Sequence, residues 1–189
     1  YIDLFDYNYY ILVIFKVYKL LFLWGDNMRI LLAEDERSLS SALVTILKYN
    51  NFSVDACFDG LEALSFLNVN NYDLVILNFA NCDMVGHTGK FDKVEEAVRA
   101  VDENVKRLYD ASLEKGFTMF VTADHGNSEV MVDDKDEVIT SHTTSPVPFI
   151  ITDKNIKNIK SGKLGDIAPT ILEYMGLDIP TEMTGDKLI

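Results

Sequence analysis

Short apolar runs alternate with amphipathic stretches along most of this chain, and this alternation is the feature that most constrains its fold. The apolar runs expected to form strands lie at 29–33, 52–56, 72–77, 117–123 and 146–152. The stretches with helical spacing lie at 38–49, 60–67, 93–115 and 165–175. Strands and helices that alternate through short loops build parallel sheets covered by helices. The sequence therefore predicts an α/β fold with three layers and a mainly parallel sheet.

The composition indicates a globular protein with a real hydrophobic core, because 48% of the 189 residues are apolar. The formal net charge of −13 repels phosphate backbones and anionic lipid surfaces, so we expect neither a nucleic-acid nor a membrane partner. Cys57 and Cys82, the two cysteines, are far apart and form no CxxC pair. This pattern is typical of reduced thiols and favours a cytoplasmic location.

Residues 1–27 are interpreted as an apolar extension ahead of the fold, which need not belong to the native protein. The run from Tyr9 to Trp24 is interrupted by Lys16 and Lys19 and is shorter than the ~20 residues of a spanning helix. Met28, followed directly by a strand-like run, resembles the start of a soluble protein. A membrane-associated helix is the alternative interpretation of this segment.

The three histidines of the chain, His87, His125 and His142, all lie in polar loops beside predicted strands. Asp83 stands four residues before His87, and Asp124 stands next to His125. A single histidine would more often be structural, but this grouping with carboxylates favours a metal centre. Carboxylate and imidazole ligands without thiolate suit manganese, zinc or iron, and the residue types do not choose among them.

Residues 28–77 resemble the first half of a response-regulator receiver domain through "MRILLAEDE", "FDGLEALSFL" and "YDLVIL". The resemblance implies that Glu34 and Asp35 would hold a magnesium ion. Asn78 stands at the phosphoacceptor position, and an amide cannot form an acyl phosphate. The alternative function, a response-regulator-type signalling module, therefore lacks its phosphoacceptor aspartate.

Residues from about 72 to 189 resemble the C-terminal part of cofactor-independent phosphoglycerate mutase, a member of the alkaline phosphatase superfamily. The matching stretches are "LNFANCDMVGHTG", "VTADHGNSEVM", "SHTTSPVPFI", "GDIAPTILEYMGL" and "MTG". The resemblance implies a glycolytic isomerase that interconverts 3- and 2-phosphoglycerate through a phosphoserine intermediate with manganese. Because "YDLVIL" fits both families, we interpret the chain as a chimera with parts 1–27, 28–77 and 78–189, and the origin of the fusion stays open.

The mutase resemblance also implies a division of the metal ligands between two sites. Asp83, His87 and His142 would form one complete manganese site, and Asp124 and His125 would contribute to a second, incomplete one. The family's nucleophilic serine and a further metal-binding aspartate belong to motifs that this sequence does not contain, and its substrate domain is also missing. We therefore assign no catalytic residue, treat phosphoglycerate as a partner by family only, and expect a metal-binding fragment that is inactive alone.

Overall fold

The computed structural model describes residues 10–16 and 28–189, and it divides into two compact units, one ending at Ile150 and one comprising Ile151–Ile189. The first unit contains β1 (Tyr10–Lys16), β2 (Arg29–Ala33), α1 (Arg37–Tyr49), β3 (Ser53–Cys57), α2 (Gly60–Val69), β4 (Leu74–Phe79), α3 (Asn81–Gly86), α4 (Phe91–Lys115) and β5 (Phe117–Thr122). Strand β6 (Phe149–Ile151) falls at the boundary, and the second unit contains the 3₁₀ turn η1 (Leu164–Asp166) and α5 (Ile167–Met175). None of the described helices combines the length and the hydropathy needed to cross a membrane.

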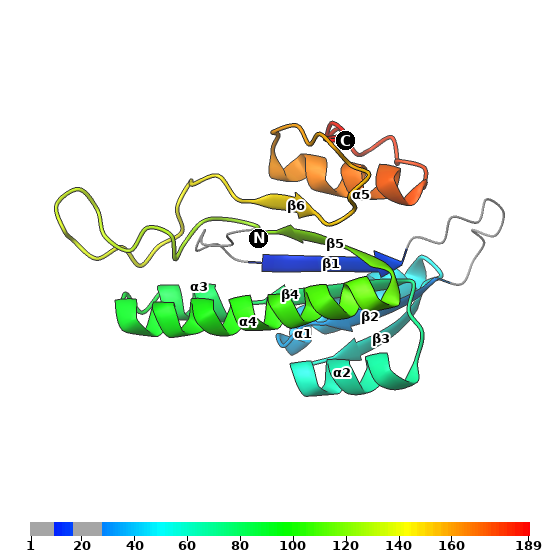
Figure 1. Ribbon diagram of the computed structural model, residues 1–189, viewed down its shortest axis with the longest axis horizontal. Helices are drawn as coiled ribbons and strands as arrows, with labels where there is room; N and C mark the ends of the chain where they lie inside the picture. Colours follow the sequence, from blue (N-terminus) through cyan, green and yellow to red (C-terminus); the bar gives the residue numbers. More distant parts are fainter. Residues whose placement is uncertain (1–9, 17–27) are drawn as a thin grey trace. The chain divides into compact units, whose positions relative to one another are not determined.

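The six strands form one sheet in the order β3-β2-β4-β1-β5-β6 (Figure 1). Strand β2 is parallel to both of its neighbours, β3 and β4. Strand β1 is antiparallel to β4 and β5, so that Leu12 lies opposite Leu77 on one side and Val121 on the other. Strands β2 to β5 therefore share one direction, and the predicted α/β fold with a mainly parallel sheet is confirmed.

Strand β1 was not anticipated by the sequence analysis, which placed its residues in an extension ahead of the fold. Its backbone pairs with β4 over Tyr10–Phe15 and with β5 over Ile11–Lys16. The run is rich in β-branched and aromatic residues, which favour strands over helices. The rest of the apolar run from Tyr9 to Trp24 lies outside the described residues.

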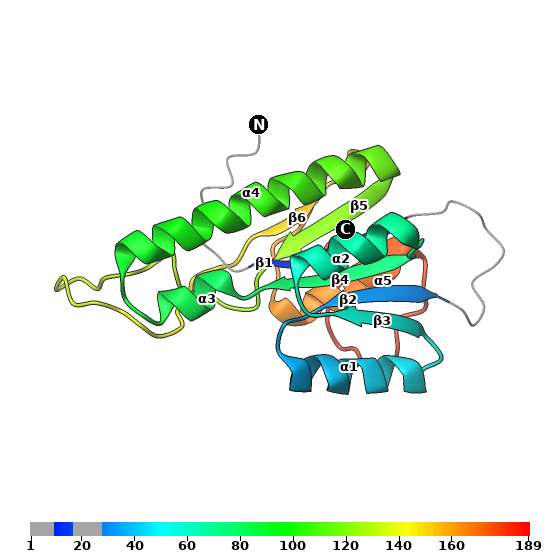
Figure 2. The same ribbon diagram turned by 90° about the horizontal axis from the view of Figure 1, so that it is seen from below.

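Helices cover both faces of the sheet, which gives the three predicted layers (Figure 2). Alternate residues of β2 point to opposite faces. Leu31 belongs to a core cluster that includes Ala63 of α2 and Val101 of α4. Ile30 belongs to a second cluster, against which Leu43 and other residues of α1 pack. Because both of its faces are buried, β2 reads in the sequence as a continuous apolar run.

Local signals set where the helices begin and end. Helix α1 begins after Glu36, whose carboxylate accepts from the backbone N–H groups of Ser38 and Leu39, and Asp59 caps α2 in the same way. Helix α4 ends at Gly116, which adopts φ 72°, a left-handed conformation that glycine adopts without steric cost. The predicted helix boundaries agree within two residues, but α3 was expected to be a loop.

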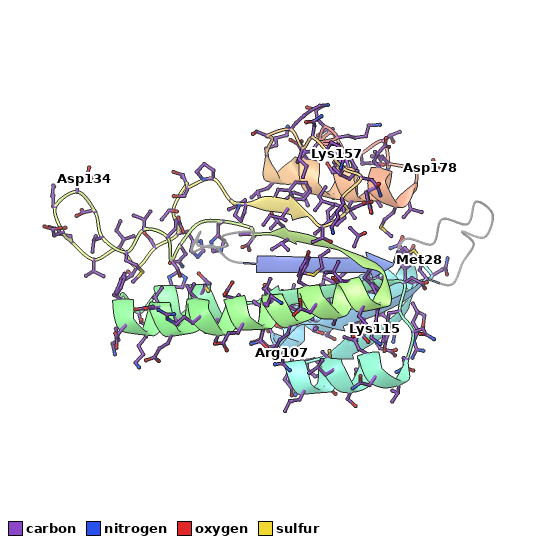
Figure 3. All side chains as sticks on the ribbon, viewed as in Figure 1. Met28, Arg107, Lys115, Asp134, Lys157 and Asp178 are labelled. Carbon is purple, nitrogen blue, oxygen red and sulfur yellow. The ribbon has the colours of Figure 1, made fainter. Side chains whose placement is uncertain are left out.

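The connection that follows β5 is long and leaves the body of the sheet. Gly126 pairs with Thr143, and Val132 pairs with Val138 further out, in two isolated bridges. Asp134 lies at the tip of this excursion (Figure 3). The stretch before the excursion contains the second predicted ligand pair, and the stretch after it contains His142.

Candidate metal centre

Asp83 and His87 are brought together by the short helix α3, at the end of the sheet where β4 finishes. The backbone N–H of His87 donates to the carbonyl of Asp83 at 3.0 Å, which closes one helical turn. Residues four apart on a helix share one face. Asp83 Oδ1 consequently lies 2.8 Å from His87 Nε2. The four-residue spacing of Asp83 and His87 therefore brings them together through one turn of a helix, whereas the sequence had placed them in a loop.

His142, which follows the long connection after β5, completes the group. Its Nε2 lies 3.1 Å from Asp83 Oδ1 and 3.2 Å from His87 Nε2. Within residues 10–16 and 28–189, this is the one group of three or more potential metal ligands whose ligand atoms all lie within 4.8 Å of one another. Three of the five predicted ligands are thus gathered at one point, across 59 positions of sequence.

The spacing of these three atoms fits the coordination shell of a divalent cation. An ion in octahedral coordination with bonds of ~2.1 Å holds neighbouring ligands ~3.0 Å apart. The observed separations of 2.8, 3.1 and 3.2 Å lie close to that value. The side chains of His87 and His142 are 42% and 49% exposed, so the remaining coordination positions would face solvent. Catalytic metal sites keep such open positions.

The orientation of His87 is set by its second ring nitrogen. Nδ1 lies 2.7 Å from the carbonyl oxygen of Thr140, which can only accept a hydrogen bond. In a neutral ring this contact places the proton on Nδ1, so that Nε2, which faces Asp83 and His142, is the nitrogen available to a cation. Outer contacts of this kind fix the tautomer of metal-binding histidines.

Asp124 and His125 lie beside this group without joining it. The two side chains approach each other to 3.7 Å between Asp124 Oδ1 and His125 Nε2. The ring of His125 stacks on that of His142, with centroids 3.7 Å apart and planes inclined by 16°. The second predicted pair is therefore adjacent to the first group and in contact with one of its members.

Glu129, a residue not predicted from the sequence, joins the two loops that carry His125 and His142. Its carboxylate accepts from the backbone N–H of Asn127 at 2.6 Å and from the hydroxyl of Thr143. Burial opposes ionisation of Glu129, but hydrogen bonds from Thr143, from Ser145 and from backbone N–H groups outweigh it and lower its pKa. Its position in "HGNSE", four residues after His125, was the available signal.

The acidic pair of the receiver-like segment takes no part in this group. Glu34 is buried and accepts a hydrogen bond from Asn78 Nδ2 at 3.3 Å. Asp35 is exposed. Neither belongs to the three-ligand group found in the described part of the chain.

Comparison with known proteins agrees with a metal centre. A family model described as the Metalloenzyme superfamily matches residues 9–179, a range that includes β1 and all five predicted ligands. A protein of Malacoplasma penetrans (strain HF-2) named 2,3-bisphosphoglycerate-independent phosphoglycerate mutase is 43% identical over 157 residues, covering 82% of this chain and 31% of that protein.

Two further relatives carry the same name. The protein of Mycoplasma genitalium is 50% identical over 121 residues, covering 64% of this chain and 24% of that protein. The protein of Clostridium botulinum is 53% identical over 130 residues, covering 68% and 26%. The chain thus spans between 24% and 31% of the length of these curated relatives.

Proposed function

Because this chain belongs to the Metalloenzyme superfamily, we propose that it is the metal-binding portion of a manganese-dependent phosphoglycerate mutase. Asp83, His87 and His142 would hold one cation, and Asp124 and His125 would contribute to a second site. The observation that most supports this is the mutual separation of the first three ligand atoms, 2.8 to 3.2 Å. Manganese in particular is proposed from the mutase resemblance.

The chain's own residues would present the cation to a phosphorylated substrate. Asp83 and His87 project from one turn of α3, and His142 closes the group from the opposite loop. A cation held there would polarise a phosphoryl oxygen and stabilise an attacking hydroxyl group as its conjugate base. The exposed sides of the two histidine rings leave room for that substrate.

We propose that these 189 residues alone bind metal without mutase turnover. The relatives that are named mutases are three to four times longer than the part that matches here. Ser128, three residues after His125, is 3% exposed and donates to the carbonyl of Cys82 at 2.7 Å, an environment that suits a structural hydroxyl. Because the nucleophile motif of the mutase family does not occur in this sequence, the nucleophile would come from elsewhere. A glycolytic role would place the protein in the cytoplasm.

Calorimetric titration with Mn²⁺ tests the metal site directly. We expect about one site per chain in the wild type and loss of that site in His87→Ala. The matched control is Asp102→Asn, which removes one exposed carboxylate on α4 that is not a member of the three-ligand group. Two equally tight sites, or unchanged binding in His87→Ala, would contradict the proposal.

The receiver-like segment supports a second candidate function, a signalling module. The order β3-β2-β4 places the second, first and third strands of residues 28–77 in the sequence 2-1-3. The same order occurs in receiver-type folds. At the adjoining strand ends, Asn78 faces Glu34 as a hydrogen-bond donor. We propose that the segment has kept this architecture but does not accept a phosphoryl group. Incubation with acetyl phosphate should therefore leave the protein without an acid-labile label. A label on an aspartate would instead favour the signalling module.

A further inference from the structure

We propose that Asn127 is a positioning residue that orients Asp83 for metal binding. The inference rests on the proposed metal site and adds to it a residue that is not itself a ligand. Asn127 lies in the loop after β5, and Asp83 lies on α3, 44 positions earlier in the chain. The Nδ2 group of Asn127 donates to Asp83 Oδ1 at 2.7 Å.

The hydrogen bond falls on the oxygen that faces the two histidines. Asp83 Oδ1 is the atom that lies 2.8 Å from His87 Nε2 and 3.1 Å from His142 Nε2. A carboxylate oxygen offers two lone pairs. With one directed to Asn127, the other is left for a cation between the histidines. The amide of Asn127 therefore holds Oδ1, and not Oδ2, toward the histidines. A carboxylate that binds a cation through one oxygen needs this orientation.

Asn127 is itself held rigidly, which a positioning residue requires. It is 2% exposed, and its backbone N–H donates to Glu129 Oε2 at 2.6 Å. Its side chain also packs closely on α3 at Gly86, where an added Cβ would lie 2.5 Å from Asn127 Oδ1 and 2.9 Å from its Cγ. Glycine at position 86 thus allows the amide to reach the helix that carries Asp83.

Loss of this contact should weaken metal binding without unfolding the chain. Freed from the amide, the Asp83 side chain can turn its carboxylate away from the histidines, and the cation must then order it again. Substitution of residues that support metal ligands from outside typically costs 10–100-fold in metal affinity. We expect Asn127→Ala to lower the affinity for Mn²⁺ by about 10-fold or more.

Ser128→Ala is the matched control for this variant. Ser128 is the next residue, is equally buried at 3% exposed, and donates one hydrogen bond to the same helix, at the carbonyl of Cys82. A merely structural role would give both alanine variants the same loss. We expect Ser128→Ala to bind Mn²⁺ as tightly as the wild type. We also expect Ser128→Ala and Asn127→Ala to have equal thermal stability without metal.

A second readout reports the ligand geometry rather than the fold. The visible absorption of bound Co²⁺ depends on which atoms coordinate it and at what angles, so Asn127→Ala should change the Co²⁺ spectrum and Ser128→Ala should not. Gly86→Ala provides an independent route to the same effect, because alanine favours the helix but displaces the Asn127 amide. It should lower Mn²⁺ affinity as Asn127→Ala does.

The outcomes separate this inference from the proposed metal site. If the wild type binds Mn²⁺ and His87→Ala does not, the metal site stands. If Asn127→Ala and Gly86→Ala then bind as tightly as the wild type with an unchanged Co²⁺ spectrum, the positioning role is wrong. Equal losses in Asn127→Ala and Ser128→Ala would also overturn it. If the wild type and His87→Ala bind Mn²⁺ alike, the metal site itself fails.

Discussion

The ring of His125 lies flat against the ring of His142, with centroids 3.7 Å apart and planes inclined by 16°. His142 is one of the three grouped residues that could hold a metal ion, whereas His125 belongs to the neighbouring pair with Asp124. Stacking therefore limits the orientations of a ligand that sits on an exposed loop. A residue proposed for the second site thus also supports the first.

Removing this stack should weaken the first metal site moderately. Aromatic pairs contribute about 0.5–1.5 kcal/mol beyond the area they bury, which corresponds to roughly 2- to 10-fold in affinity. We expect His125→Ala to lose Mn²⁺ affinity within that range and His125→Phe, which keeps a ring but no ligand nitrogen, to lose less. Titration calorimetry measures both, and equal affinities for the two variants would show that the ring does not support His142.

Glu129 should make the fold more sensitive to acid than its overall charge implies. Burial opposes its ionisation, but the hydrogen bonds from Thr143, from Ser145 and from backbone N–H groups lower its pKa below the usual value of 4.5. A group whose pKa is lowered by folding stabilises the native state above its unfolded pKa, and this contribution is lost as the pH falls through the folded pKa. We therefore expect the free energy of unfolding to fall as the pH drops below about 4.5.

The variant Glu129→Gln isolates that effect. It keeps the shape of the side chain but removes the charge and one acceptor, so near neutral pH it should cost about 1 kcal/mol. As the pH falls through the lowered pKa of Glu129, the difference from the wild type should shrink, because wild-type Glu129 then becomes protonated too. Urea unfolding at several pH values checks this, and a difference that is independent of pH would contradict it.

The two thiols should be unreactive in the folded protein. Burial raises the pKa of Cys82 to about 11. Burial, followed by the nearby carboxylates Glu62 and Asp59, raises the pKa of Cys57 to about 11 as well. Since the thiolate is the reactive form, iodoacetamide at pH 8 should modify both slowly in buffer and quickly in urea. Fast modification of Cys82 in buffer, followed by mass spectrometry, would indicate that α3 opens locally.

The sequence predicted the elements whose signals are local, and it singled out Asp83, His87 and His142 because each stands in a short motif. Residues 29–33 form a strand as expected, because a run buried on both faces must be continuously apolar. Helix α3 was missed because six residues are too few to show a helical period. Asn127 and Glu129 were missed because their roles depend on contacts that form only in the folded chain, such as the hydrogen bond from Asn127 to Asp83. No periodicity or spacing in the chain records that contact.

Strand β1 provides the sharpest test of whether the N-terminal segment belongs to the fold. Val13 lies opposite Ile76 of β4 on one side and Phe120 of β5 on the other. Because β1 has a strand on each side, the N–H of every residue within it is directed at a neighbouring strand. Proline has no N–H and is tolerated in sheets only at edges or bulges.

We therefore expect Val13→Pro to lower the free energy of unfolding by ~1–3 kcal/mol through one unsatisfied buried carbonyl group, with further loss where the ring disturbs the ladder. The control is Asp134→Pro, at the second position of the turn closed by the hydrogen bond from Asp136 N to Asp133 O at 3.1 Å, where proline is favoured. It should leave stability nearly unchanged. Urea denaturation followed by circular dichroism compares the three proteins. If Val13→Pro is as stable as Asp134→Pro, Tyr10–Lys16 is an extension outside the fold. If only Val13→Pro is destabilised, the N-terminal segment joins β4 to β5. The ends of these two strands, which lead to the proposed metal ligands, then depend on that segment.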